Sequence, residues 1–205
     1  MASLDPRAAL ALPAVFRLFK RLVLPAANQR RFLRDVVGIR EGQRVLDIGC
    51  GLGDVLEQLP PVEYHGFDAS EAYIEAARMR YGSRGRFTCA RVSRYSLGEL
   101  ERRCDVAMAN GVLHHLDDAE AISLLEVAVA ALKPGGRLVT IDPCFAAGQN
   151  PIARFIISRD RGRHVRSEAE WLRLARRVGP GVRSQLKHDL LRIPYTHIVL
   201  EVQNP

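Results

Sequence analysis

A short apolar segment, residues 45–48, contains one acid, Asp47, and is followed at once by three alternating glycines. Glycines at a strand-to-helix turn let backbone approach a ligand closely, and a carboxylate at the mouth of that turn suits a cationic ammonium group better than a pyrophosphate. The dinucleotide pattern GxGxxG also requires a glycine where this chain has Asp54. We therefore expect a ligand with a positively charged group at these glycines, which are Gly49, Gly51 and Gly53.

Four later side chains could move a proton. His114 and His115 follow an apolar segment, and an imidazole has an ordinary pKa near pH 7. Either ring could accept a proton from a substrate hydroxyl or amine, or could only order the loop before the next helix. Asp142, at the end of another apolar segment, could act as a base or pair with an arginine. Asp160 is the fourth candidate catalytic residue.

Residues 143–166 interrupt the alternation of strand and helix patterns along the chain. We expect this stretch to lie on the substrate side of the ligand site. Loops longer than about 12 to 15 residues are usually functional or disordered. Arg161 and Arg166 could clamp a carboxylate or phosphate with paired hydrogen bonds, and His164 is a third candidate substrate ligand. Alternatively, Asp160 and Arg161 could lock the loop through internal hydrogen bonds.

From residue 44 onward, strand patterns alternate with helix patterns. Strands are expected at 44–48, 63–67, 86–89, 105–109, 137–141, 182–190 and 196–202, and helices at 54–59, 71–80, 119–132, 151–157 and 167–178. This alternation predicts the α/β class: a single Rossmann-like doubly wound sheet of seven strands, mostly parallel, with ligands at the carboxyl ends of the strands. The last two strands have no helix between them, so we expect a C-terminal antiparallel hairpin.

Helices are also expected before the sheet, in residues 14–24 and 28–37. We therefore divide the chain into an N-terminal helical lid or cap at 1–40 and a ligand-binding domain at 41–205, with the substrate-side insertion at 143–166. The first helix is basic and amphipathic, so it could pack as a lid or contact a membrane surface peripherally.

Five segments in order resemble the motifs of class I S-adenosylmethionine-dependent methyltransferases of the small-molecule type. They are residues 45–53, 64–68, 104–110, 113–116 and 133–138, and the resemblance covers about half of the chain. It implies S-adenosyl-L-methionine as cofactor, with S-adenosyl-L-homocysteine as product. It also implies methyl transfer to an oxygen, nitrogen or carbon atom of a small-molecule acceptor. The cofactor carries the ammonium group that suits Asp47.

The resemblance implies roles for individual residues around the cofactor. Asp47 would hold the methionyl ammonium, and Asp68 would accept both ribose hydroxyls, although Asp68 could instead cap the following helix. Arg91 stands near the place of an acid that binds adenine in many relatives, and an arginine cannot accept that hydrogen bond. Further contacts would come from Gly49, Cys50, Gly51, Gly53, Ala69, Ser70, Val92, Asn110 and Gly111.

Length and composition indicate which broad class of protein this chain belongs to. A chain of 205 residues with 47% apolar residues suits one globular domain. No segment reaches the roughly 18 apolar residues of a transmembrane helix, and the early charges lie on the wrong side for a signal peptide. We therefore expect a cytoplasmic protein. The four cysteines lack metal-ligand spacing, so we expect reduced thiols and no metal.

The net charge of +7 is concentrated in residues 151–205, which hold 11 basic and 5 acidic residues. Such a region could attract an acidic small molecule or nucleic acid, or could consist of solvated arginines. Nucleic-acid methylation is disfavoured because residues 110–113 lack the Asn/Asp-Pro-Pro-aromatic tetrad of adenine-N6 enzymes. A non-catalytic cofactor-binding protein is a further alternative, against which the intact glycine loop and Asp68 argue. We expect a monomer or homodimer.

Overall fold

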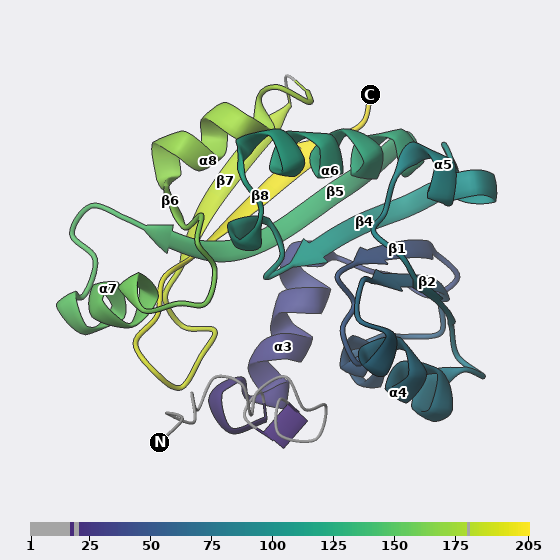
Figure 1. Ribbon diagram of the computed structural model, residues 1–205, viewed down its shortest axis with the longest axis horizontal. Coiled ribbons are helices and arrows are strands. Elements are labelled where there is room, and N and C mark those ends of the chain that lie inside the picture. The colour runs from purple at the N-terminus through teal and green to yellow at the C-terminus, as the bar shows by residue number, and fades with distance from the viewer. Residues whose placement is uncertain (1–16, 19–20, 180) are drawn as a thin grey trace, which may run out of the picture.

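Eight strands form one twisted sheet at the centre of the structure, a computed structural model that describes residues 17–18, 21–179 and 181–205 (Figure 1). Seven strands follow the order β3-β2-β1-β4-β5-β8-β7, and the short strand β6 pairs with β5. β1 to β5 pair in parallel, whereas β8 runs antiparallel to β5 and β7. The strands are β1 (Arg44–Ile48), β2 (Glu63–Asp68), β3 (Arg86–Cys89), β4 (Cys104–Asn110), β5 (Leu132–Phe145), β6 (Arg166–Ser167), β7 (Val182–Lys187) and β8 (His197–Gln203).

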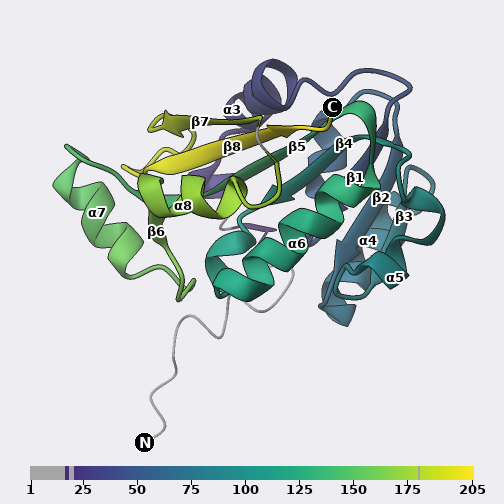
Figure 2. The same ribbon diagram turned by 90° about the horizontal axis from the view of Figure 1, so that it is seen from above.

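Helices connect the parallel strands and cover both faces of the sheet, as Figure 2 shows from above. One hydrophobic cluster packs α5, α6 and α8 on one face, and a second packs α3, η1, η2 and α4 on the other. The helices are α3 (Ala26–Phe32), the π-helix η1 (Leu33–Val37), the 3₁₀ helix η2 (Asp54–Gln58), α4 (Glu71–Tyr81), α5 (Arg94–Leu97), the 3₁₀ helices η3 (Gly98–Leu100) and η4 (Leu113–His115), α6 (Asp118–Ala131), α7 (Pro151–Ser158) and α8 (Glu168–Ala175).

Short polar residues start several of these helices at the places that the sequence predicts. The Asp117 side chain accepts a hydrogen bond from the Glu120 backbone N–H at 2.9 Å, and Ser167 caps α8 in the same way through Glu170. These caps satisfy amide groups that a helix start leaves unpaired. They fix where each helix begins relative to the strand before it, and so where the loop at the strand end lies.

The predicted fold class is confirmed, including the antiparallel pair at the C-terminus. The structure adds the two-residue strand β6, and β5 extends beyond the expected 137–141 in both directions. The expected helix at 54–59 is a 3₁₀ helix, and α5 was not predicted. The strand expected at 182–190 ends at Lys187, because the chain then turns into the loop at 188–196.

The N-terminal region follows the prediction where the structure describes it. The helix expected at 28–37 is present as α3 and η1, and ends at Gly38 with φ +65°. Residues 21–23 are helical, while residues 14–16 and 19–20 of the first expected helix lie outside the described residues. Within residues 17–18, 21–179 and 181–205, helices of a length and hydropathy suited to crossing a membrane are absent.

Candidate functional site

Two adjoining cavities lie at the carboxyl ends of β1, β2, β4 and β5. The larger has a volume of about 1010 Å³ and the smaller of about 490 Å³. The glycine loop, the end of β4 and His114 contribute to both walls, so the cavities share one junction. Parallel strands end at this edge, and ligands of open α/β sheets bind there.

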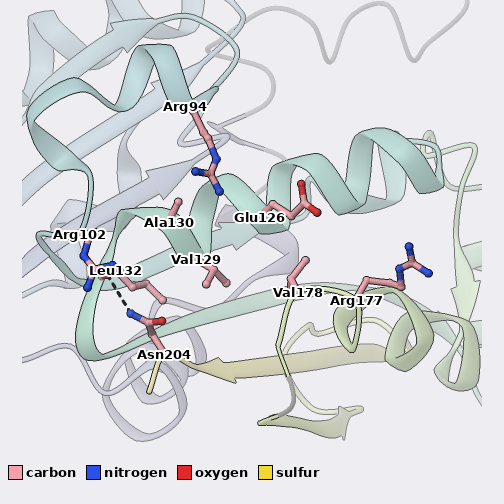
Figure 3. A pocket seen from close by; sticks show the side chains of 9 residues that line it. All are labelled: Arg94, Arg102, Glu126, Val129, Ala130, Leu132, Arg177, Val178 and Asn204. Atoms are coloured by element: carbon pink, nitrogen blue, oxygen red, sulfur yellow. Dashed lines mark hydrogen bonds between the residues drawn. The ribbon is translucent and has the colours of Figure 1, made fainter.

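A third cavity, of about 390 Å³, lies among α5, α6 and the end of α8 (Figure 3). Arg94, Arg102 and Arg177 line it, together with Glu126. In Figure 3 the arginine side chains come from separate segments, and Arg177 points away from Arg102. This cavity contains none of the predicted site residues, so the strand-end cavities are the candidate site.

The glycine loop has the backbone that its sequence predicts. Gly49, Gly51 and Gly53 have φ angles of +73°, +55° and +69°, in the left-handed region that favours glycine. A Cβ at Gly49 would lie 2.3 Å from a methyl of Val112, whereas a Cβ at Gly51 would meet no described atom within 4 Å. The loop therefore packs tightly at its first glycine and leaves open space at its second.

Asp68 lies at the end of β2 and lines the larger cavity. Its two carboxylate oxygens accept hydrogen bonds from the backbone N–H groups of Gly51 at 2.9 Å and Ser70 at 2.8 Å. A carboxylate has further lone pairs beyond these two bonds. The N-cap of α4 is Ser70, which accepts from Tyr73. Asp68 is therefore oriented by backbone and is not needed as the cap.

Asp47 lies on β1, with 3% of its surface exposed, and lines the smaller cavity. The Tyr64 hydroxyl donates a hydrogen bond to one of its carboxylate oxygens at 2.5 Å. Burial raises the pKa of Tyr64, so that hydroxyl keeps its proton and remains a donor. The acid is held below the glycine loop, where the sequence places it.

Asn110 and Gly111 follow β4 and line both cavities. The Asn110 side-chain oxygen is buried and lacks a hydrogen-bond partner among the described residues. Gly111 has φ +71°, and its N–H donates to the Ile141 carbonyl at 2.7 Å. A buried polar atom without a partner costs free energy, so a ligand that donates to Asn110 would be favoured.

The other residues predicted for the cofactor divide into two groups. Cys50, Ala69 and Val92 line the larger cavity, together with Arg91, whose guanidinium pairs with Glu120 at 3.3 Å. Gly53 and Ser70 lie outside the lining of both strand-end cavities. They act locally: a Cβ at Gly53 would approach the Phe87 ring to 2.8 Å, and Ser70 caps α4.

His114 lies between two carboxylates. Its Nδ1 is 2.8 Å from an oxygen of Asp142, and its Nε2 is 3.3 Å from an oxygen of Asp160. The same Asp142 oxygen accepts from the His114 backbone N–H at 3.1 Å. Burial alone would lower the pKa of His114, but the two acids outweigh it and raise the pKa to about 9. The ring is therefore protonated near pH 7, with a carboxylate at each nitrogen.

The two acids have different surroundings. Asp142 is 1% exposed, and burial raises its pKa despite the hydrogen bonds from His114. Asp160 is also bound by the Gly162 backbone N–H at 2.8 Å and the Tyr195 hydroxyl at 2.7 Å. Burial alone would raise the pKa of Asp160, but these bonds and His114 hold it well below its usual range. The loop after α7 is thus fixed to β5 through charged hydrogen bonds.

His115 stacks beside His114, with ring centroids 4.0 Å apart, and lines the larger cavity. Partial burial and the positive charge of His114 lower the pKa of His115. The two histidines therefore differ in charge near pH 7, although they are adjacent in the chain.

The three predicted substrate ligands lie in different places in the structure. Arg161 lines both cavities. His164 lies outside the lining of both, and its backbone N–H donates to the His114 carbonyl at 2.9 Å. Arg166 is 6% exposed, pairs with Asp118 at 2.9 Å and lies over the Trp171 ring. Its guanidinium also donates to the main-chain carbonyls of Leu113, Leu116 and His164.

The expected clamp of Arg161 and Arg166 is therefore not assembled. Pairing of β6 with β5 turns Arg166 toward η4 and α8 instead of the cavity. Arg166→Ala should lower the free energy of unfolding by about 2 kcal/mol, because it removes the hydrogen bonds to three main-chain carbonyls, the ion pair with Asp118 and the contact with Trp171. It should leave cofactor affinity within about twofold. Chemical denaturation and calorimetric titration measure the two effects. A large loss of affinity with unchanged stability would contradict this assignment.

Sequence reasoning missed Tyr195 and His197, which line the smaller cavity. Arg159 in the expected insertion, and Val23 and Leu24 in the expected lid, also line it but were not singled out. The His197 Nδ1 is buried and has no hydrogen-bond partner within the described part of the chain, and burial lowers the pKa of His197 to about 4. Groups of three or more His, Cys, Asp or Glu able to hold a metal ion are absent from residues 17–18, 21–179 and 181–205.

Known proteins resemble this chain in sequence and fold. A family model described as a methyltransferase domain matches residues 46–138. The O-methyltransferase resE of Aspergillus sclerotiorum is 33% identical over 123 residues, which are 56% of this chain and 46% of that protein. Trans-aconitate 2-methyltransferase of Variovorax paradoxus is 32% identical over 139 residues, 66% of this chain and 49% of that protein. The chain thus spans less than half the length of these two relatives.

A solved structure shows the same fold over almost the whole chain. Phosphoethanolamine N-methyltransferase 2 of Haemonchus contortus, in complex with phosphomonomethylethanolamine and S-adenosylhomocysteine, matches with a TM-score of 0.73. The identity is 14%, and the match covers 97% of this chain and 58% of that chain. At this identity the likeness shows the fold alone.

Proposed function

We propose that this chain, a member of the class I S-adenosylmethionine-dependent methyltransferases, transfers a methyl group to a small molecule held in the smaller cavity. The observation that carries the proposal is the junction of the two cavities beside the glycine loop and Asn110. A cofactor in the larger cavity would present its reactive end there.

The residues present fit S-adenosylmethionine. Open space lies above Gly51, where a side chain would obstruct a ligand. Asp68 is fixed by two backbone N–H groups at the edge of the larger cavity, in position for a pair of ribose hydroxyls. The unpartnered oxygen of Asn110 and the buried carboxylate of Asp47 suit the ammonium end. When bound, the cofactor supplies a methyl group already activated on a sulfonium.

The chain's own contribution is then orientation and exclusion of water. Val23, Leu24 and Leu191 line both cavities and cover the junction with apolar surface. This supports the N-terminal residues as a lid and 143–166 as the substrate-side insertion. His114 positions the loop at Asp160 through its two charged hydrogen bonds, and its protonated ring is unsuited to accept another proton.

His197, which the sequence did not mark as a candidate, offers an uncharged imidazole to the acceptor in place of His114. Its imidazole is neutral near pH 7 and lies in the wall of the smaller cavity, so it can exchange a hydrogen bond with the acceptor. Arg159 and Arg161 also line this cavity, and they favour an acidic group on the acceptor. An oxygen acceptor agrees with this wall and with the name of the relative resE, an O-methyltransferase.

Isothermal titration calorimetry tests the proposal. We expect saturable binding of both S-adenosylmethionine and S-adenosylhomocysteine at micromolar concentrations, and no binding of NAD at the same concentrations. A protein that binds neither sulfur compound, or that prefers the dinucleotide, would rule the proposal out.

A further inference from the structure

Exposed large apolar side chains gather on two segments of the structure. Leu18 and Leu22 are 61% and 58% exposed, and Ile152 and Phe155 on α7 are each 59% exposed. Among the described residues only two more belong to this class, Met79 on α4 and Tyr95 on α5. Scattered single apolar residues need no explanation, whereas grouped ones mark interaction surfaces.

The two segments flank the same opening. Val23 and Leu24, directly after Leu22, line the smaller cavity, and so do Ile156 and Arg159 on and after α7. The loop at 188–196 contacts both, since the Arg192 backbone N–H donates to the Val23 carbonyl at 2.8 Å and the Tyr195 hydroxyl donates to Asp160, after α7, at 2.7 Å. Figures 1 and 2 show α7 standing clear of the sheet beyond the end of β5.

The outer face of α7 is apolar and cationic. Ala153 and Ile157 are buried on its inner side, which leaves Ile152 and Phe155 outward. The helix Pro151–Ser158 contains no acidic residue, and Arg154 is exposed within it. Arg159 follows, with its guanidinium 4.9 Å from the Phe155 ring. The next acid, Asp160, binds Gly162 and Tyr195 inside the molecule and does not neutralise this face.

We propose that this docking rim, formed by Leu18, Leu22, Ile152, Phe155, Arg154 and Arg159, binds to an anionic lipid surface. Amphipathic elements with apolar and basic side chains lie in the headgroup region, where apolar burial and attraction to anionic lipids add. A second copy of this chain fits poorly, because a symmetric contact through α7 would place arginines against arginines. The smaller cavity then opens at the lipid headgroups.

Sedimentation of the full chain with lipid vesicles tests the proposal. We expect binding to vesicles of phosphatidylcholine mixed with an equal amount of phosphatidylglycerol, weakening as salt screens the charges. Vesicles of phosphatidylcholine alone should bind far less protein. Absence of binding to the mixed vesicles, or equal binding to both kinds, would overturn the proposal.

Two matched pairs of variants locate the surface. The double variant Ile152→Ser/Phe155→Ser should lower the vesicle partition coefficient at least about tenfold, whereas Met79→Ser/Tyr95→Ser should leave it unchanged. Arg154→Gln should lower it about fivefold, and Arg177→Gln, in the wall of the third cavity and outside the docking rim, should have no such effect. Equal effects within either pair would overturn the proposal.

The docking proposal rests on the proposed function, because it takes the smaller cavity as the site of methyl transfer. A final comparison distinguishes failure of lipid docking from failure of the methyltransferase proposal. Ile152→Ser/Phe155→Ser should keep wild-type affinity for S-adenosylmethionine, because neither side chain lines a cavity. Vesicle binding that fails while cofactor binding persists contradicts the docking rim alone. A concentration-dependent dimer in light scattering that this double variant abolishes would assign the surface to a second copy instead.

Discussion

Replacing Asp68 with alanine should weaken binding of S-adenosylmethionine at least about a hundredfold. The carboxylate would accept two ribose hydroxyls, and hydrogen bonds to a charged group contribute about 1.5–3 kcal/mol each. Two such bonds are worth at least about 3 kcal/mol, and each 1.4 kcal/mol corresponds to a tenfold change in affinity. Calorimetric titration of the variant with S-adenosylmethionine measures the change directly.

Asp68 also orients the Gly51 and Ser70 backbone N–H groups, so the variant needs two controls. Asp68→Asn keeps an oxygen that can accept from backbone but loses the charge, and it should fall between wild type and alanine. Glu75→Ala removes an exposed carboxylate from α4 and should bind the cofactor normally. Unchanged affinity in Asp68→Ala, with a normal circular dichroism spectrum, would show that the ribose lies elsewhere.

The difference in unfolding free energy between wild type and His114→Gln should shrink by about 3 kcal/mol as pH rises. The pKa of His114 is raised from its ordinary 6.5 to about 9 in the folded protein. A raised pKa means that the folded state binds the proton more tightly. The resulting stability is fully present below about pH 6.5 and is lost as pH rises through about 9. The size follows from about 1.4 kcal/mol for each pKa unit.

Urea denaturation at several pH values between about 6 and 10 measures this difference. His164→Gln is the matched control, because His164 contacts His114 through its backbone N–H. The curve of its unfolding free energy against pH should run parallel to the curve of the wild type. If the curve for His114→Gln were also parallel to wild type, the ring would not be held as a cation between Asp142 and Asp160.

Local features of the site could be predicted from the sequence. The turn that exposes backbone to a ligand is predictable from the glycines at 49 and 51, and Asp68 from its place at the end of an apolar strand. Each of these depends on a segment of a few residues and on the general rule that ligands bind at the strand ends. The sheet was predictable for the same reason, since each strand and helix carries its own periodicity.

Contacts between distant segments could not be predicted in this way. Asp142 lies 28 residues after His114, so the raised pKa of the histidine depends on how β5 and η4 pack. Arg166 lies in the insertion near Arg161, but β6 pairs with β5 and directs it toward Asp118. His197 reaches the cavity because β8 pairs antiparallel with β5, and no short motif marks that pairing.

A crystal structure of the protein with S-adenosylhomocysteine tests the central claim most directly. We expect the adenosine in the larger cavity, both ribose hydroxyls on Asp68, and the amino-acid tail over Gly51 toward Asp47. The sulfur should lie at the junction with the smaller cavity. Density for the ligand at another surface, or strand-end cavities left empty at saturating ligand, would contradict this account.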